Sequence, residues 1–195
     1  MDVLSPINTP SDPVICPDDE NTKLSGEETI TYHNNSKNKL EYLWMQLDQN
    51  IRKKDAPALE KGSSGMSPAS TASRFADQYL KEPFDGGFNI EEVKAGGDKL
   101  SYTINNTMMR IDLPEPLEAG ESFTFSVKWW YNINNHIVDR ARSGYEQFED
   151  GHRAYEIAQF FPRMAVYNDV EGWQNMQFWG SGEFALPFGD YEVSI

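Results

Sequence analysis

The chain has 195 residues, enough for one substantial domain, and 38% of them are hydrophobic, enough to form a core. Its 31 acidic residues against 17 Lys and Arg give a net charge of −14, which disfavours nucleic acid and anionic membrane surfaces as partners. No apolar run is long enough to span a bilayer, and no signal-peptide pattern opens the sequence. We therefore expect no nucleic-acid partner and no membrane insertion.

The first residues predict two kinds of structure. Residues 1–25 carry four Pro among many Asp, Asn and Ser, which is typical of an irregular lead-in. Residues 26–33 alternate, with Glu28, Ile30 and Tyr32 on one face, and residues 40–48 form a second apolar run of strand length. Because an Asn-rich turn separates the two runs, the sequence predicts a β-hairpin.

Residues 52–85 differ in composition from the rest of the chain. Most of this stretch is polar and rich in Gly, Ser and Pro, which indicates a long surface insertion. One short helix fits across 70–82, because Phe75, Tyr79 and Leu80 would share a helical face.

The second half of the chain predicts further short strands separated by turn residues. A strand over 122–133 alternates in polarity, which would place the adjacent Trp129 and Trp130 on opposite faces. A long polar connection covers 134–152. The other expected strands are two around the Gly96-Gly97 turn and those over 108–113, 153–161 and 182–195. Many short strands at close spacing predict an all-β fold, either a β-sandwich or an open curved sheet.

The sequence offers no set of residues for catalysis or metal binding. Only three His are present, and none lies in an H-E-x-x-H motif. His152 and Glu156 are four residues apart, but this spacing aligns ligands on a helix and not on the strand expected there. Cys16 has no second Cys, and the G-S-G-E-F run at 180–184 is explained as a glycine turn. We therefore predict no catalytic residue, no metal site and no cofactor in this chain.

Three stretches nevertheless carry a family resemblance. They begin E-T-I-T-Y-H at Glu28, M-R-I-D-L at Met109 and Y-E-I-A-Q-F-F-P-R-M-A-V-Y-N-D-V-E-G-W at Tyr155. The chain resembles the N-terminal domain of the aminopeptidase N family of zinc metallopeptidases, and residues 159–173 match a run found in its bacterial members. The resemblance covers 26–51 and 108–195, but not 1–25 or 52–85.

The resemblance implies an architecture and a set of partners. It implies a curved, saddle-like β domain over 26–195 with an insertion at 52–85, truncated before a catalytic domain that carries H-E-x-x-H and the zinc. The expected partners are that catalytic domain of the same polypeptide and a peptide substrate. This chain alone is then inactive, and a periplasmic or secreted bacterial location is favoured over a cytoplasmic one.

In this family the domain also supplies a Gln or Glu that holds the free α-amino group of the substrate. A carboxylate or an amide suits this role because each accepts hydrogen bonds from an ammonium group. Glu156 and Gln159 are the candidates, with Glu156 preferred, and on a strand they would lie on opposite faces. Pro162 is expected to end that strand, and Arg163 to pair with Asp169 or with a carboxylate of the missing domain.

Other functions stay open. The rings of the 158–173 stretch fit an aromatic corner of the core as well as a substrate surface. A free-standing β-sandwich module that binds carbohydrate or protein is the main alternative, with Trp129, Trp130, Trp173 and Trp179 as candidates for stacking on sugars. A purely structural scaffold is the third hypothesis.

Overall fold

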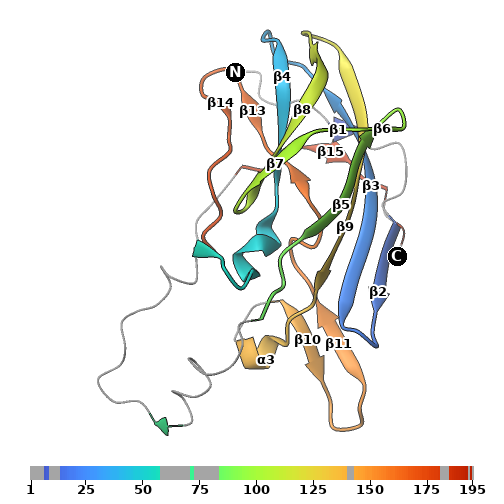
Figure 1. Cartoon of the computed structure of the whole chain (residues 1–195), viewed down its shortest axis with the longest axis vertical. Coiled ribbons are helices and arrows are strands. Elements are labelled where there is room, and N and C mark those ends of the chain that lie inside the picture. Colours follow the sequence, from blue (N-terminus) through green and yellow to red (C-terminus); the bar gives the residue numbers. More distant parts are fainter. Residues whose placement is uncertain are drawn as a thin grey trace.

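Two facing β-sheets form the body of the protein (Figure 1). The computed structural model describes residues 7–8, 14–57, 71–72, 84–139, 143–180, 185–192 and 194. The predicted all-β sandwich is confirmed by these sheets, which are largely antiparallel and do not close into a barrel. None of the helices in the described ranges has the length and hydrophobicity needed to cross a bilayer.

The larger sheet has seven strands, in the order β15-β1-β3-β9-β5-β6 with β2 paired to β3. Their bounds in chain order are β1 Ile7–Asn8, β2 Val14–Asp18, β3 Lys23–His33, β5 Asn89–Ala95, β6 Asp98–Lys99, β9 Ser122–Asn132 and β15 Gly189–Asp190. The smaller sheet has the order β12-β4-β8-β7, from β4 Leu40–Gln46, β7 Tyr102–Asn105, β8 Met108–Leu117 and β12 Arg163–Met164.

Smaller elements complete the fold. Two ribbons stand apart from the main sheets: β10 Gly144–Gln147 pairs with β11 Arg153–Glu156, and β13 Tyr167–Asn168 pairs with β14 Gly172–Trp173. A 3-10 helix, η1 (Asp48–Arg52), follows β4, and a four-residue helix, α3 (His136–Asp139), precedes β10. The β10–β11 ribbon projects from the lower end of the sandwich in Figure 1.

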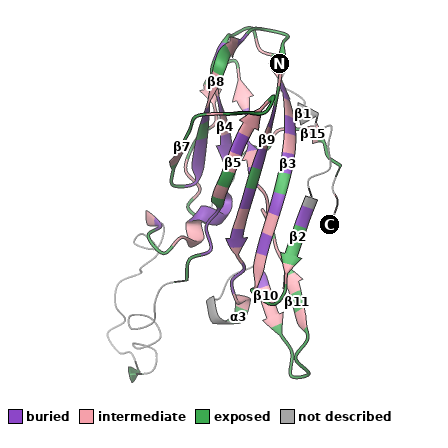
Figure 2. Cartoon of the chain, turned by 45° about the vertical axis from the view of Figure 1, so that its right-hand side comes forward, coloured by how far each residue is buried: buried purple, intermediate pink, exposed green. Residues whose placement is uncertain are grey.

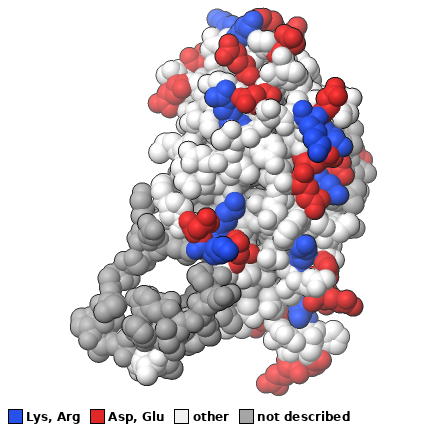
Figure 3. All heavy atoms as spheres, viewed as in Figure 1, with Lys and Arg blue, Asp and Glu red and all other residues white. Residues whose placement is uncertain are grey.

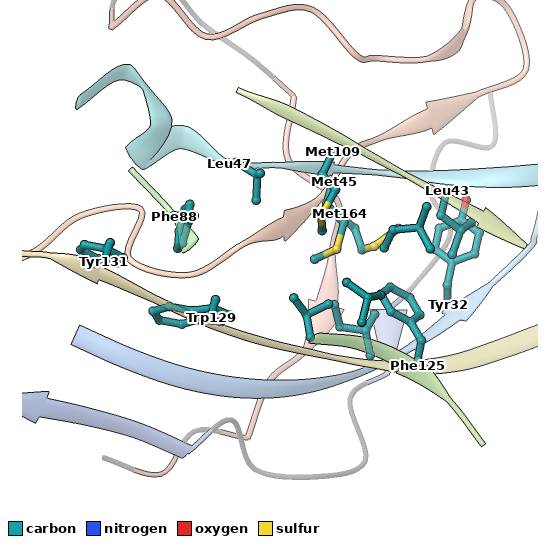
Figure 4. Packing of buried hydrophobic residues seen from close by; sticks show 14 of the residues in the cluster. Tyr32, Leu43, Met45, Leu47, Phe88, Met109, Phe125, Trp129, Tyr131 and Met164 are labelled. Atoms are coloured by element: carbon teal, nitrogen blue, oxygen red, sulfur yellow. The ribbon is translucent and has the colours of Figure 1, made fainter. Parts of the chain in front are cut away.

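The hydrophobic core lies between the two sheets, as the alternation of apolar and polar side chains along the strands requires. Buried and more exposed residues alternate along β3 and β9 (Figure 2), because successive side chains of a strand point to opposite faces. The larger sheet contributes Tyr32, Phe125 and Trp129 to the core (Figure 4). The smaller sheet contributes Leu43, Met45, Met109 and Ile111, all fully buried.

The predicted hairpin between 26–33 and 40–48 is wrong. β3 pairs with β9 along its whole length, and β4 pairs with β8 in the other sheet. Asn34 provides the physical reason, because its buried amide donates to the carbonyls of Asn38 (2.8 Å) and Leu117 (3.0 Å). These bonds hold the Asn-rich segment in a path from one sheet to the other, so the chain does not reverse within one sheet.

Other boundaries also differ from the prediction. The described part of 1–25 is not irregular: it contains β1, β2 and the start of β3, because β2 pairs with the extended end of β3. β8 continues past residue 113 to Leu117, since β7 pairs with it only as far as Ile111 and needs no N–H from Pro114 or Pro116.

The polar connection over 134–152 contains α3 and β10, because β10 finds a partner in β11. Most of the predicted 52–85 insertion and its short helix lies outside the described residues. Within the described part of 182–195, the paired strand is the short β15.

Candidate functional site

Residues 156–163 connect the β10–β11 ribbon to β12 and carry both candidate anchors. Glu156 is the last residue of β11, where it lies opposite Gly144, and its side chain is exposed. Gln159 is half-buried and lies outside any strand. The predicted strand over 153–161 is therefore wrong beyond Glu156, and the two candidates do not lie on opposite faces of one strand. Pro162 does not end that strand but precedes β12.

The helix η1 lies directly against this segment. It follows β4 and begins with Asp48, Gln49 and Asn50, whose exposed fractions are only 3%, 2% and 2%. Three consecutive buried polar side chains need internal partners, because an unpaired buried polar group costs about 1–3 kcal/mol. Each of the three binds a different part of the chain.

Asn50 fixes two neighbouring turns. Its amide nitrogen donates to the carbonyl of Asn106 (2.6 Å), in the turn between β7 and β8. Its Oδ1 accepts from the backbone N–H of Phe88 (2.8 Å), just before β5. This residue therefore joins η1 to both sheets.

Gln49 binds the candidate segment itself. Its Nε2 donates to the carbonyls of Ala158 (2.9 Å) and Gln159 (3.2 Å). Its Oε1 accepts from Nη1 of Arg52 (2.9 Å), and Nη2 of Arg52 donates to Ser143 Oγ (3.3 Å). Because Arg52 can only donate, the amide nitrogen of Gln49 is directed at the two carbonyls.

Gln159 has an unusual backbone conformation. Its φ angle is +55°, in the left-handed region, which costs a residue with a Cβ about 1 kcal/mol or more. The bend lets consecutive carbonyls, those of Ala158 and Gln159, face the same amide of Gln49. A strand through this position is excluded by the same conformation.

Arg163 forms a buried ion pair at the other end of the segment. Its Nη2 donates to Oδ2 of Asp48 and lies 3.3 Å from Oε1 of Gln46. The expected partner Asp169 is exposed, so the predicted pairing is corrected to Asp48. Burial raises the pKa of Asp48, and Arg163 offsets only part of that rise. Desolvation thus outweighs the attraction, as is common for buried pairs.

The aromatic rings of 158–173 pack mainly inward. Phe160 and Phe161 are in contact, with ring centroids 4.9 Å apart, and both lie against the core. Trp173 packs between Tyr167 (5.2 Å) and the buried Tyr32 (5.8 Å). The core interpretation of these rings is therefore supported.

The Trp side chains do not form one sugar-binding platform. Trp129 is buried in the core, and Trp130 on the opposite face is covered by the ammonium of Lys23, 3.5 Å from its ring centroid. Trp173 is packed as described above. Trp179 is partly exposed but lies beside η1, next to Ile51 and Thr107.

The described residues bring together no group of three or more His, Cys, Asp and Glu that would suit a metal ion. His152 lies beside Asp150 (3.1 Å) and His136 beside Glu146 (3.4 Å). Cys16 is an exposed free thiol.

Asp48, Gln49 and Arg52 were not among the sequence-predicted site residues. A signal was present, because the polar run 48–50 directly follows the apolar strand β4. The sequence does not reveal which distant segments these side chains reach, since the partners of Asp48 and Gln49 in 158–163 lie more than 100 residues away.

No protein-family model matches the chain, and no curated protein matches its sequence. Among solved structures, the chain is similar to a mutant M1 zinc metallopeptidase from Deinococcus radiodurans, with 12% identity and a TM-score of 0.40 over 74% of this chain and 23% of that one. The unmutated M1 zinc metallopeptidase from the same organism also has 12% identity, with a TM-score of 0.39 over 87% of this chain and 28% of that one.

The chain thus spans about a quarter of the length of these metallopeptidases. At this identity and TM-score, the similarity assigns the chain neither a family nor an activity.

Proposed function

We propose that this chain is the non-catalytic β domain of a zinc metallopeptidase of the aminopeptidase N type. In this proposal it packs on a catalytic domain that holds the zinc, and it forms one wall of the substrate cleft. The 156–159 segment supplies a hydrogen-bond acceptor for the α-amino group of a peptide. The chain itself performs no chemical step.

One observation carries the proposal. Asp48 and Gln49, from the first stretch that resembles the family, hold residues 158–163 from the third. β3 and β4 of the first stretch also pair with β9 and β8 of the second. Stretches that are far apart in the sequence thus meet around the segment that would bind the amino group.

The chemistry of the segment is suited to an ammonium group. The Glu156 carboxylate is exposed, so it is accessible to a ligand and is not occupied by a cation among the described residues. Gln159 has an amide oxygen that accepts hydrogen bonds without carrying a charge. An acceptor at this position would orient the first peptide bond of a substrate towards a neighbouring catalytic centre.

The exposed apolar side chains support a partner surface. The segment 176–191 exposes large apolar side chains at Met176, Trp179, Leu186, Phe188 and Tyr191. In the view of Figure 3, charged side chains gather along the upper and right-hand margins and in one cluster near the centre of the face, with uncharged surface between them. Exposed apolar groups of this size are typical of surfaces that another domain covers.

The test is to express the complete open reading frame that encodes this chain and to measure zinc content and aminopeptidase activity. A downstream H-E-x-x-H motif, stoichiometric zinc and release of amino-terminal residues are the expected results. Glu156→Ala or Gln159→Ala is expected to raise KM for a free amino-terminal substrate about tenfold, as for a lost charge-assisted hydrogen bond. Glu149→Ala, in the exposed turn of the β10–β11 ribbon, is the control. A frame without metallopeptidase motifs, or two variants with unchanged KM, would refute the proposal.

A further inference from the structure

Gln49 is the side chain through which the sandwich controls the conformation of the candidate anchor segment. We propose that Gln49, oriented by Arg52, is a positioning residue that holds Gln159 in its left-handed conformation. The inference rests on the proposed function, since that function gives the 156–159 segment a ligand.

The first step of the argument is the geometry of the contact. A single amide nitrogen binds two consecutive carbonyls, at 2.9 Å from Ala158 and 3.2 Å from Gln159. In an extended strand, consecutive carbonyls point in opposite directions, so one donor cannot bind both. The two bonds therefore require the bend at Gln159, whose φ angle is +55°.

The second step is the rigidity of the donor. Gln49 is almost fully buried on η1, and its Oε1 is held by Arg52 at 2.9 Å. Arg52 in turn donates to Ser143, at the base of the β10–β11 ribbon. Rotation of the Gln49 amide by 180° would place its single oxygen against the two carbonyl oxygens and its NH₂ group against the guanidinium of Arg52, so no hydrogen bond would form on either side. The amide is thereby restricted to one orientation.

The third step is the consequence for the anchor candidates. Glu156 ends a ribbon strand, whereas Gln159 lies in a bend that buried side chains determine. Without the two bonds, residue 159 is expected to return to a negative φ angle, because the hydrogen bonds that offset the cost of the left-handed conformation are lost. The direction of the Gln159 side chain from the backbone would change with it.

The experiment uses the 195-residue chain and a pair of substitutions. Gln159→Gly in the otherwise unchanged chain is expected to raise Tm by about 1–3 °C, since Gly adopts a positive φ without steric cost. In a Gln49→Ala background the same change is expected to lower Tm or leave it unaltered, because the bend is gone and Gly only adds entropy to the unfolded state. Thr22→Gly, at another residue with positive φ (+49°), is expected to have the same effect in both backgrounds.

A spectroscopic measurement separates positioning from general stability. The ¹³Cα and ¹³Cβ chemical shifts of Gln159 report its backbone conformation, and they are expected to leave the left-handed range in Gln49→Ala. Gln174→Ala, which removes an amide that donates to Glu171, is expected to leave them unchanged. The inference would be overturned if Gln159→Gly changed Tm equally in both backgrounds. It would also be overturned if the chemical shifts of Gln159 stayed in the left-handed range in Gln49→Ala. These readouts need no enzyme, so they are independent of whether the proposed function holds.

Discussion

Glu28 is a carboxyl group on the inner face of β3, between Gly26 and Ile30. It is only 5% exposed, and its Oε1 accepts no hydrogen bond from the described residues. Burial therefore raises the pKa of Glu28 well above its usual value of 4.5. Above its usual pKa, the folded chain therefore favours the protonated, neutral form of this carboxyl group more than the unfolded chain does.

The first prediction concerns the pH dependence that this group causes. Below about pH 4.5 both states are protonated, so Glu28 contributes no dependence there. As the pH rises above that value, the free energy of unfolding falls, and it stops falling once the pH has passed the raised pKa of Glu28 in the folded state. The total loss is about 1.4 kcal/mol for each unit by which folding raises this pKa. Glu28→Gln is expected to abolish this fall in the free energy of unfolding, as measured by urea unfolding curves between pH 4 and 9.

The matched control is Glu27→Gln, on the exposed face of the same strand. It is expected to leave the pH dependence nearly unchanged. If Glu28→Gln and the parent chain lost stability equally as the pH rose, the carboxyl group would not be buried in its neutral form.

The second prediction concerns the ion pair of Asp48 and Arg163. Asp48→Ala leaves a buried guanidinium without its carboxylate and is expected to lower the free energy of unfolding by about 3–5 kcal/mol. The exposed pair of Arg110 and Asp112 is the control, since Asp112→Ala is expected to cost less than about 1 kcal/mol.

The same pair allows a second comparison. Because burial of the charges offsets much of their attraction, Asp48→Leu combined with Arg163→Met is expected to recover most of the loss. A double variant as unstable as Asp48→Ala would show that the charges themselves stabilise the fold.

At the scale of elements, β3 and β9 are held together by a close approach at Gly26. A Cβ atom on Gly26 would lie 2.5 Å from Cζ2 of Trp129, which is buried and packs against Phe88 and Tyr131. Gly26→Ala is therefore expected to lower the free energy of unfolding by about 1–3 kcal/mol in denaturant titrations, because the indole cannot move without disturbing the core.

Gly87→Ala is the control for this third prediction. Its new Cβ would meet the side chain of Lys53, whose flexible methylene groups can move aside. The substitution is expected to change stability by less than about 1 kcal/mol. Equal losses of stability in Gly26→Ala and Gly87→Ala would show that the clash with Trp129 is not what destabilises the Gly26→Ala variant.

At the scale of the whole molecule, the exposed apolar side chains of Leu186 and Phe188 are expected to contribute little to the stability of this chain. Leu186 and Phe188 are 48% and 70% exposed. Leu186→Ser combined with Phe188→Ser is expected to leave Tm within about 2 °C of the parent value while reducing the binding of a hydrophobic dye.

Phe125→Ser, in the core, is the control for this fourth prediction and is expected to cost at least about 3 kcal/mol. A large drop in Tm for the Leu186 and Phe188 double variant would contradict the assignment of this surface to a partner. It would show instead that the two side chains support the fold itself.

Several features of this protein follow from its sequence alone. The alternation of β3 and β9 was predicted because period-2 patterning is local, and so was the Gly96-Gly97 turn between β5 and β6. These features depend on neighbouring residues, which is why they could be predicted.

Only the tertiary structure decided which strands pair and what holds the candidate site. Strands β3 and β4 belong to different sheets because Asn34 binds Leu117, a residue 83 positions away. The bend at Gln159 exists because Gln49 binds it from 110 positions away, and local propensity favoured a strand there. Contacts over such distances leave no periodic pattern in the sequence, so only the folded chain shows them.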